Sequence, residues 1–276
     1  MKSDKPWSKP PEYLLRPKPT NVLYRDLRPW NAGDYREDVQ DDFEYWRTPE
    51  VLASEGSAMA TVAEVKENPM AGWGDWTPSG KIDQIHKFCN KHWVSTLGKV
   101  VVEVGCGGGK QLWAWDMFNN IRDDSIDYVP EPHVGGLRLF GIDHSPEAIR
   151  VAQARMPYGV RFICALASKF HYSLPVKADL VYTHTCLQHN SHHKFSPIFD
   201  SVYKALADDG ILWLMNELTI DSAEYVGKYH QDVKMTPWVT DERGSHGTAA
   251  WWIGMVADAG FELLSYEKSS YIFRRI

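Results

Sequence analysis

The chain has 276 residues, 43% of them hydrophobic, and a formal net charge of -6. This is enough apolar material for a large core, and the negative charge argues against a protein that binds nucleic acid by broad attraction to phosphates. No apolar run approaches the roughly 20 residues that cross a bilayer, and the four cysteines form no C-x-x-C pair. We therefore expect a cytoplasmic protein, without membrane contact, whose partner is a small molecule.

Residues 1–70 are expected to form an N-terminal addition to the main domain. Prolines recur through residues 1–30, where they prevent continuous helix and favour an extended arm. Acidic residues cluster in 34–44, which we interpret as the solvated face of a helix, and the stretch that follows to Glu67 has a helical composition. The main domain is then predicted to comprise residues 71–276.

From Lys99 onward, short β-branched runs alternate with amphipathic segments, as in strand and helix units on a parallel sheet. We predict a Rossmann-like, doubly wound and mostly parallel α/β sheet, with the N-terminal helical and extended additions beside it. Its seven strands are expected at residues 100–104, 137–142, 160–163, 180–182, 211–215, 261–266 and 271–275.

Three of the intervening helices have clear sequence signals. Ser145 caps a helix that Pro146 opens, because proline at the first helical position loses only a donor that has no partner there. A second helix has an apolar face over 198–206 and is expected to end at the Asp-Gly pair 209–210. A third is predicted over 248–259.

Two long connections interrupt this alternation. Residues 119–136 have no sustained periodicity and are interpreted as a surface insertion. Residues 218–247 are rich in tyrosine, histidine and charge. We expect them to form a lid-like excursion near the carboxyl ends of the strands, where ligands bind in open α/β sheets.

A glycine-rich turn follows the first predicted strand and leads into a helix. With Glu103 ahead of it, the turn has the pattern E-x-G-x-G-x-G, whose glycines are Gly105, Gly107 and Gly109. Glycines permit unusual backbone angles and let a ligand approach main-chain amides at the positive end of a helix. The dinucleotide fingerprint G-x-G-x-x-G requires a glycine where this chain has Lys110. The turn therefore predicts a nucleotide-like ligand without matching the dinucleotide pattern.

Asp143 directly follows the strand predicted at 137–142, where an acid can accept hydrogen bonds from both hydroxyls of a ribose. Its distance from the turn exceeds the usual ~20 residues of such a unit, and the insertion at 119–136 accounts for the excess. The alternative is a simple helix-entry acid ahead of Ser145.

Four segments in this order resemble motifs of the class I S-adenosylmethionine-dependent methyltransferases, particularly the broad group that acts on small molecules. They are VVEVGCGGGK, GIDHSPEAIRVAQAR, ADLVYTHTCLQHN and DDGILWLMNE. The resemblance covers about residues 73–276. It implies that the domain 71–276 binds S-adenosylmethionine and moves its methyl group to an oxygen or nitrogen of a small-molecule acceptor.

Carried over position by position, the resemblance implies a set of cofactor contacts. Glu103 would orient the turn and the amino end of the methionine part, and Gly105 to Gly109 would line that part. Asp143 would hold the ribose, and His144 would flank the adenine. Family members often place an acid after the third strand, but Ala165 and Leu166 stand there and offer backbone contacts. The full set is Trp73, Trp76, Glu103, Gly105, Cys106, Gly107, Gly109, Lys110, Asp143, His144, Ala165, Leu166 and Thr183.

For Trp73 and Trp76, two interpretations stay open. Aromatic faces attract the positive sulfonium, so these side chains would shield it, or they simply pack a helix onto the sheet.

Methyl transfer is an in-line displacement, in which the protein aligns the nucleophile and excludes water, and a base assists when the nucleophile carries a proton. His184 is the first candidate for this base. His189 either takes part directly or packs and caps a helix, and Glu217 is a candidate to hold a substrate hydroxyl or amine. The histidines around residue 189 do not match a zinc spacing, so no metal is expected.

Rival functions remain. The same fold serves protein and RNA methyltransferases, although the aromatic-flanked Pro-Pro of amino-methylating nucleic acid enzymes is replaced here by the residues 183–186, THTC. From other classes, an NAD-dependent oxidoreductase and a non-catalytic cofactor-binding subunit stay open. Binding of S-adenosylmethionine against NAD separates them.

Overall fold

The computed structural model describes residues 60–68, 71–72, 79–120, 136–156, 158–187, 195–215, 240–241, 244–245, 249–267 and 270–276. The arm predicted for 1–30, the acidic cluster 34–44 and nearly all of the connections 119–136 and 218–247 lie outside these residues. Within the described ranges, no helix combines the length and apolar character that crossing a bilayer requires.

Seven strands form one mostly parallel sheet in the order β3-β2-β1-β4-β5-β9-β8. The pairs β1–β4, β4–β5 and β2–β3 are parallel, whereas β9 runs antiparallel to both β5 and β8. The strands are β1 (Val100–Val104), β2 (Arg138–Asp143), β3 (Val160–Cys164), β4 (Ala178–His184), β5 (Leu206–Met215), β8 (Phe261–Glu267) and β9 (Ser270–Arg275). The predicted Rossmann-like fold class and all seven predicted strands are confirmed.

Helices flank these strands. They are α3 (Val62–Glu67), α4 (Ser79–His92), α5 (Lys110–Asn120), α6 (Pro146–Arg155), α7 (Phe195–Ala205) and α9 (Ala249–Asp258), with a short 3-10 helix η4 (Phe170–Tyr172). A two-stranded hairpin, β6 (Thr240–Asp241) and β7 (Gly244–Ser245), lies within the predicted excursion 218–247. α3 confirms the C-terminal end of the helical stretch expected up to Glu67, whose earlier residues lie outside the described ranges. The boundary at residue 70 stays a prediction.

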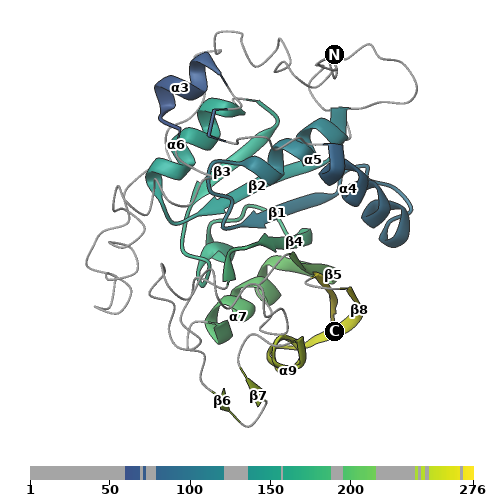
Figure 1. Ribbon diagram of the computed structural model, residues 1–276. Helices are drawn as coiled ribbons and strands as arrows, with labels where there is room; N and C mark the ends of the chain where they lie inside the picture. The colour runs from purple at the N-terminus through teal and green to yellow at the C-terminus, as the bar shows by residue number, and fades with distance from the viewer. Residues whose placement is uncertain are drawn as a thin grey trace, which may run out of the picture. The chain divides into compact units, whose positions relative to one another are not determined.

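The chain divides into two compact units, of which the first comprises Met1–Gly98 and Cys106–Cys164. In it, α5 and α6 pack on β2, α6 also packs on β3, and α3 lies against α6 (Figure 1). Gly141 in β2 makes this packing close, because a Cβ there would lie 2.6 Å from the Phe162 ring and 2.7 Å from the Leu112 side chain. The predicted cap is confirmed, since the Ser145 hydroxyl accepts a hydrogen bond from the Ala148 amide at 3.2 Å.

The insertion predicted at 119–136 connects α5 to β2. Its two ends meet, because the Asn119 side-chain oxygen accepts a hydrogen bond from the Leu137 amide at 2.9 Å. A segment whose ends are joined in this way lengthens the connection without disturbing the strand that follows.

The second unit comprises Lys99–Gly105 and Ala165–Ile276. Here α7 packs on β4, β5 and α9, and α9 packs on β8. All five residues of β1 are buried, as expected for a valine-rich strand in a parallel sheet. The Phe195 ring of α7 meets the fully buried Trp252 of α9 edge to face, with centroids 5.1 Å apart.

The predicted end of the second helix is wrong. α7 ends at Ala205, and Leu206 already begins β5, in register with Ala178 of β4. The next paired residue of β5 is Ile211, so residues 207–210 leave the ladder, and Asp209 has a φ of 59°. The Asp-Gly pair therefore marks a bulge inside the strand rather than a helix exit, because pairing of Leu206 with β4 takes precedence over helical periodicity.

Candidate functional site

The glycine turn between β1 and α5 adopts the backbone geometry that its sequence requires. Gly105, Gly107 and Gly109 have φ values of 76°, 49° and 85°, all in the left-handed region. Residues with a Cβ seldom adopt these angles. The alternating pattern E-x-G-x-G-x-G thus places a glycine at each left-handed position of the turn.

The surroundings of these three glycines differ. A Cβ at Gly105 would overlap the Cys186 sulfur, and a Cβ at Gly109 would overlap the Met156 methyl group. A Cβ at Gly107, in contrast, would meet no heavy atom of the described residues within 4 Å. The turn is therefore packed at both ends and open at Gly107, where a ligand can reach the backbone.

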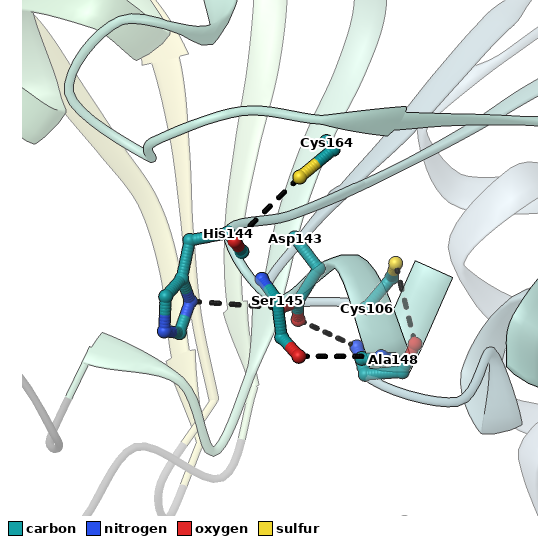
Figure 2. Close-up of polar contacts among 7 residues, drawn as sticks. Cys106, Asp143, His144, Ser145, Ala148 and Cys164 are labelled. Carbon is teal, nitrogen blue, oxygen red and sulfur yellow. Dashed lines mark hydrogen bonds and ion pairs between the residues drawn. The ribbon is translucent and has the colours of Figure 1, made fainter. Parts of the chain in front are cut away.

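Asp143, the last residue of β2, ties this open part of the turn to the start of α6 (Figure 2). Its Oδ2 accepts a hydrogen bond from the Gly107 amide at 2.9 Å, and its Oδ1 accepts one from the Ser145 amide at 2.8 Å. The Cys106 amide also donates to the Ile142 carbonyl at 3.0 Å. Asp143 is therefore a helix-entry acid, as the second sequence interpretation had it, and it also supports the glycine turn. Its contact with a ribose stays a prediction.

His144 lies beside this carboxylate, with its Nδ1 3.5 Å from Asp143 Oδ1 and a third of its side chain exposed (Figure 2). The Cys164 thiol at the end of β3 donates to the His144 carbonyl at 3.6 Å. On the turn itself, the Cys106 thiol donates to the Gly107 carbonyl at 3.7 Å. The residues assigned to adenine and to the turn therefore form one connected polar group, and the adenine contact of His144 stays a prediction.

Two cationic side chains, Lys110 and Arg155, lie beside the glycine turn. Lys110 begins α5, and burial together with the positive charge of Arg155 lowers its pKa. Arg155 is fully buried and donates to the Gly108 carbonyl at 2.8 Å and to the Ala71 carbonyl. Burial lowers the pKa of the Arg155 guanidinium to about 10, so it stays protonated at neutral pH.

Arg155 was not singled out by the sequence reasoning, although a signal was present. On the predicted helix, Ala148, Val151 and Ala152 form the apolar face, and Arg155 continues this face at a spacing of three to four residues. A charged residue on the buried face of an amphipathic helix requires a specific partner. Here the partners are backbone carbonyls.

Glu103 on β1 belongs to the second unit and is 2% exposed. Its Oε2 accepts a hydrogen bond from the Tyr182 hydroxyl at 3.0 Å, and the two residues are partners in the β1–β4 ladder. One step further along, Val104 pairs with the buried Thr183. The carboxylate that precedes Gly105 is therefore fixed by the neighbouring strand before any ligand arrives.

The end of β4 carries the candidate base. His184 is its last residue, and Thr185 follows with a φ of 51°, which is strained for a β-branched side chain. The Thr185 amide donates to the Met215 carbonyl at 3.1 Å, and its hydroxyl donates to the His184 carbonyl at 2.7 Å. Sequence composition gives no signal for this conformation, so Thr185 was missed.

The same hydroxyl also fixes the ring of His184. Thr185 Oγ1 lies 3.3 Å from His184 Nδ1, and its single proton already points to the carbonyl. It can therefore accept from the ring when the proton of neutral His184 is on Nδ1, and this tautomer leaves the lone pair on Nε2.

Several predicted site residues lie outside the described residues, namely Trp73, Trp76, His189 and Glu217. Ala165 and Leu166 directly follow β3, and Ala165 is buried. Their contact with an adenine stays a prediction. Among the described residues, no group of three or more His, Cys, Asp or Glu side chains is arranged to hold a metal ion.

No protein-family model matches the chain, and no curated protein matches it. Among solved structures, the chain is similar to the magnesium protoporphyrin IX methyltransferase from Synechocystis PCC 6803 with bound S-adenosylmethionine. The two are 14% identical with a TM-score of 0.53, over 88% of this chain and 99% of that one. The fold is that of the class I S-adenosylmethionine-dependent methyltransferases.

A second solved structure is the amino pentose methyltransferase of calicheamicin biosynthesis from Micromonospora echinaspora, also with S-adenosylmethionine bound. It is 16% identical with a TM-score of 0.53, over 77% of this chain and 97% of that one. At such identities the likeness concerns the fold alone, so the reaction is inferred from the site.

Proposed function

We propose that this protein binds S-adenosylmethionine and transfers its methyl group to an oxygen or nitrogen of a small-molecule acceptor. The observation that carries the proposal is the glycine turn, which is left-handed at Gly105, Gly107 and Gly109, open at Gly107, and joined there to Asp143. A turn of this kind presents backbone to a ligand, and the carboxylate lies beside the opening.

The residues present fit the nucleoside end of this cofactor. A carboxylate offers about four acceptor positions, and the two amides on Asp143 use two of them. The remaining positions suit the two hydroxyls of a ribose. Gly107 has no side chain to fill the space beside them.

The strand order supports S-adenosylmethionine over a nicotinamide dinucleotide. The dinucleotide fold has strands in the order 3-2-1-4-5-6 with the fingerprint G-x-G-x-x-G on its first turn. In this chain β9 runs antiparallel between β5 and β8, and Lys110 occupies the position of the third glycine. Both departures disfavour the oxidoreductase alternative.

When bound, S-adenosylmethionine supplies an electrophilic methyl carbon on a sulfonium whose sulfide departs without an acid. The tasks of the chain are then to orient, to exclude water and to move a proton. Asp143 and the Gly107 backbone orient the nucleoside, and Glu103 supports the turn from β1. His184, with its lone pair on Nε2, accepts the proton of an acceptor hydroxyl or ammonium at that atom. We keep Glu217 and His189 as proposed acceptor contacts.

A small acceptor is favoured by the charge and by the end of β4. The net charge of -6 gives no general attraction for a phosphate backbone, and the residues 183–186 lack the Pro-Pro of amino-methylating nucleic acid enzymes. The two similar structures carry the names of a protoporphyrin and an amino pentose enzyme. This fold therefore accommodates acceptors of very different shape.

Calorimetry tests the cofactor. We expect S-adenosylmethionine and S-adenosylhomocysteine to release heat on binding, and NAD to release none. Failure of both S-adenosyl compounds to bind contradicts the proposal. Radiolabelled S-adenosylmethionine, incubated with separate metabolite, protein and RNA fractions, tests the acceptor class. Label in the metabolite fraction is expected, and label confined to protein or RNA supports a macromolecular acceptor instead.

A further inference from the structure

Arg155 joins two segments that are far apart in the sequence. One guanidinium nitrogen donates to the Gly108 carbonyl in the glycine turn, 47 residues away. The other donates to the Ala71 carbonyl, 84 residues away and just after α3. Both contacts lie within the first compact unit. A single side chain thus connects the turn to the segment 60–72.

Residues 60–68 and 71–72, the described part of the segment 60–72, are packed against the same helix that carries Arg155. α3 lies on α6 (Figure 1) and begins with a capping box, in which the Thr61 hydroxyl accepts from the Glu64 amide and the Glu64 carboxylate accepts from the Thr61 amide. Gly72 ends the segment with a φ of 79°, and a Cβ there would lie 3.1 Å from the Ala60 amide nitrogen. The apolar contact is made by Ala60, Val65 and Val151, with Val62, Ala71 and Ala154 around them.

The C-terminal end of α6 supports the turn as well. A Cβ at Gly109 would overlap the Met156 methyl group and lie 3.4 Å from the Ala152 Cβ. Arg155 holds the carbonyl of the preceding residue, Gly108. The backbone of the turn is therefore fixed from behind by one helix end, while a Cβ at the open Gly107 would meet no heavy atom of the described residues within 4 Å.

Only an arginine serves this geometry. The planar guanidinium has donors that point in different directions, so it bonds two carbonyls from different segments, whereas a lysine ammonium is a single point of charge. Removing the side chain would leave the buried Gly108 carbonyl and the partly buried Ala71 carbonyl with fewer partners, and a cavity between the segments. The position of the glycine turn would then no longer depend on the position of the segment 60–72.

We propose that Arg155 is a positioning residue that couples the docking of segment 60–72 to ligand binding at the glycine turn. A ligand that orders the turn then stabilises the docked segment, and a docked segment raises the affinity for the ligand by the same factor. The identity of the ligand rests on the proposed function, whereas the coupling between the two segments does not.

The test compares Arg155→Met and Arg155→Lys with Arg150→Met. Arg150 lies on the same helix but is exposed and pairs with the exposed Glu147, so it is a matched control. Affinity for S-adenosylhomocysteine is measured by calorimetry. Hydrogen–deuterium exchange of peptides covering 60–72 and 105–110 is measured with and without this compound.

In the unsubstituted protein we expect S-adenosylhomocysteine to slow exchange in both peptides. Arg155→Met is expected to weaken binding about ten-fold or more and to remove the protection of 60–72. Arg155→Lys should fall between, because one carbonyl keeps its partner, and Arg150→Met should behave like the unsubstituted protein. Val65→Ala tests the coupling from the other end, since it loosens α3 on α6 without touching the turn, and it should also weaken binding.

Three outcomes overturn the inference. The first is a folded Arg155→Met protein with unchanged affinity and unchanged protection of 60–72. The second is faster exchange of 60–72 in this variant with unchanged affinity, which indicates a purely structural role. The third concerns the case in which the unsubstituted protein binds no S-adenosyl compound, so that the proposed function fails. Hydrogen–deuterium exchange without ligand then tests the connection between the two segments. An Arg155→Met protein in which exchange is not faster in both 60–72 and 105–110 overturns the inference. Should Arg155→Met fail to fold, Arg155→Lys and Val65→Ala decide in the same way.

Discussion

Replacing Asp143 by asparagine should weaken both the fold and the binding of the cofactor. The carboxylate accepts the Gly107 amide at 2.9 Å and the Ser145 amide at 2.8 Å, and 11% of the side chain is exposed. Asparagine keeps the shape but offers one acceptor oxygen, so one of the two amides faces a side-chain N–H instead.

The size of the effect follows from the lost bond. A hydrogen bond to a charged group contributes about 1.5 to 3 kcal/mol, which corresponds to roughly 3 to 12 °C in melting temperature for a domain of this size. Because the same carboxylate is proposed to bind the ribose, the dissociation constant for S-adenosylhomocysteine should rise ten-fold or more, a change of about 1.4 kcal/mol per factor of ten.

Thermal unfolding and calorimetry measure the two effects, and Asp179→Asn is the matched control. Asp179 accepts the Val100 amide at 2.8 Å and pairs with Lys99 at the start of β1, the end opposite to the turn. It should therefore lose melting temperature but keep its affinity. An Asp143→Asn protein with unchanged affinity would remove Asp143 from the binding site, and one with an unchanged melting temperature would refute its support of the turn.

Three further predictions concern titratable groups. In ¹⁵N-histidine spectra, neutral His184 should carry its proton on Nδ1 in the unsubstituted protein and in Thr185→Ser, whereas Thr185→Val should lose this preference; the same tautomer in all three contradicts the assignment. Burial raises the pKa of the Cys89 thiol to about 12, so mass spectrometry should find it unalkylated by iodoacetamide at pH 8 until the protein is denatured. Burial, with the charge of Lys91, lowers the pKa of His92 below its ordinary 6.5, so the unfolded chain takes up the proton first as the pH falls below about 6.5. Stability should then decline in denaturant titrations, less so in His92→Phe, and equal declines would exclude His92.

The sequence was sufficient to predict the strands, because β-branched runs between polar turns identify buried strands of a parallel sheet. Their ends were harder to predict. β4 extends to His184 because β5 supplies a pairing partner, Met215, beyond the last pair with β1. Leu206 likewise belongs to β5 because it pairs with Ala178 of β4. Pairing between distant segments decides such strand boundaries, and the local periodicity of the sequence carries no information about this pairing.

Some residues of the candidate site could also be predicted from the sequence, and others could not. The glycines of the turn and Asp143 were found from the sequence because they are local consequences of a strand, a turn and a helix entry. Arg155 was not, since its partners at Gly108 and Ala71 become neighbours only when α3 packs on α6. The left-handed conformation of Thr185 was also missed, because a threonine in the sequence does not indicate a positive φ.

The unequal surroundings of the three glycines have a practical consequence. Side chains at Gly105 and Gly109 collide with Cys186 and Met156, whereas at Gly107 no neighbour among the described residues stands in the way and the φ of 49° is what restricts the residue type. Asparagine tolerates that angle better than other residues with a side chain. Gly107→Asn is therefore expected to block the proposed ligand site while the backbone of the turn keeps its conformation. A folded variant that has lost the proposed ligand site is the reference needed when an unknown acceptor is sought in a complex mixture.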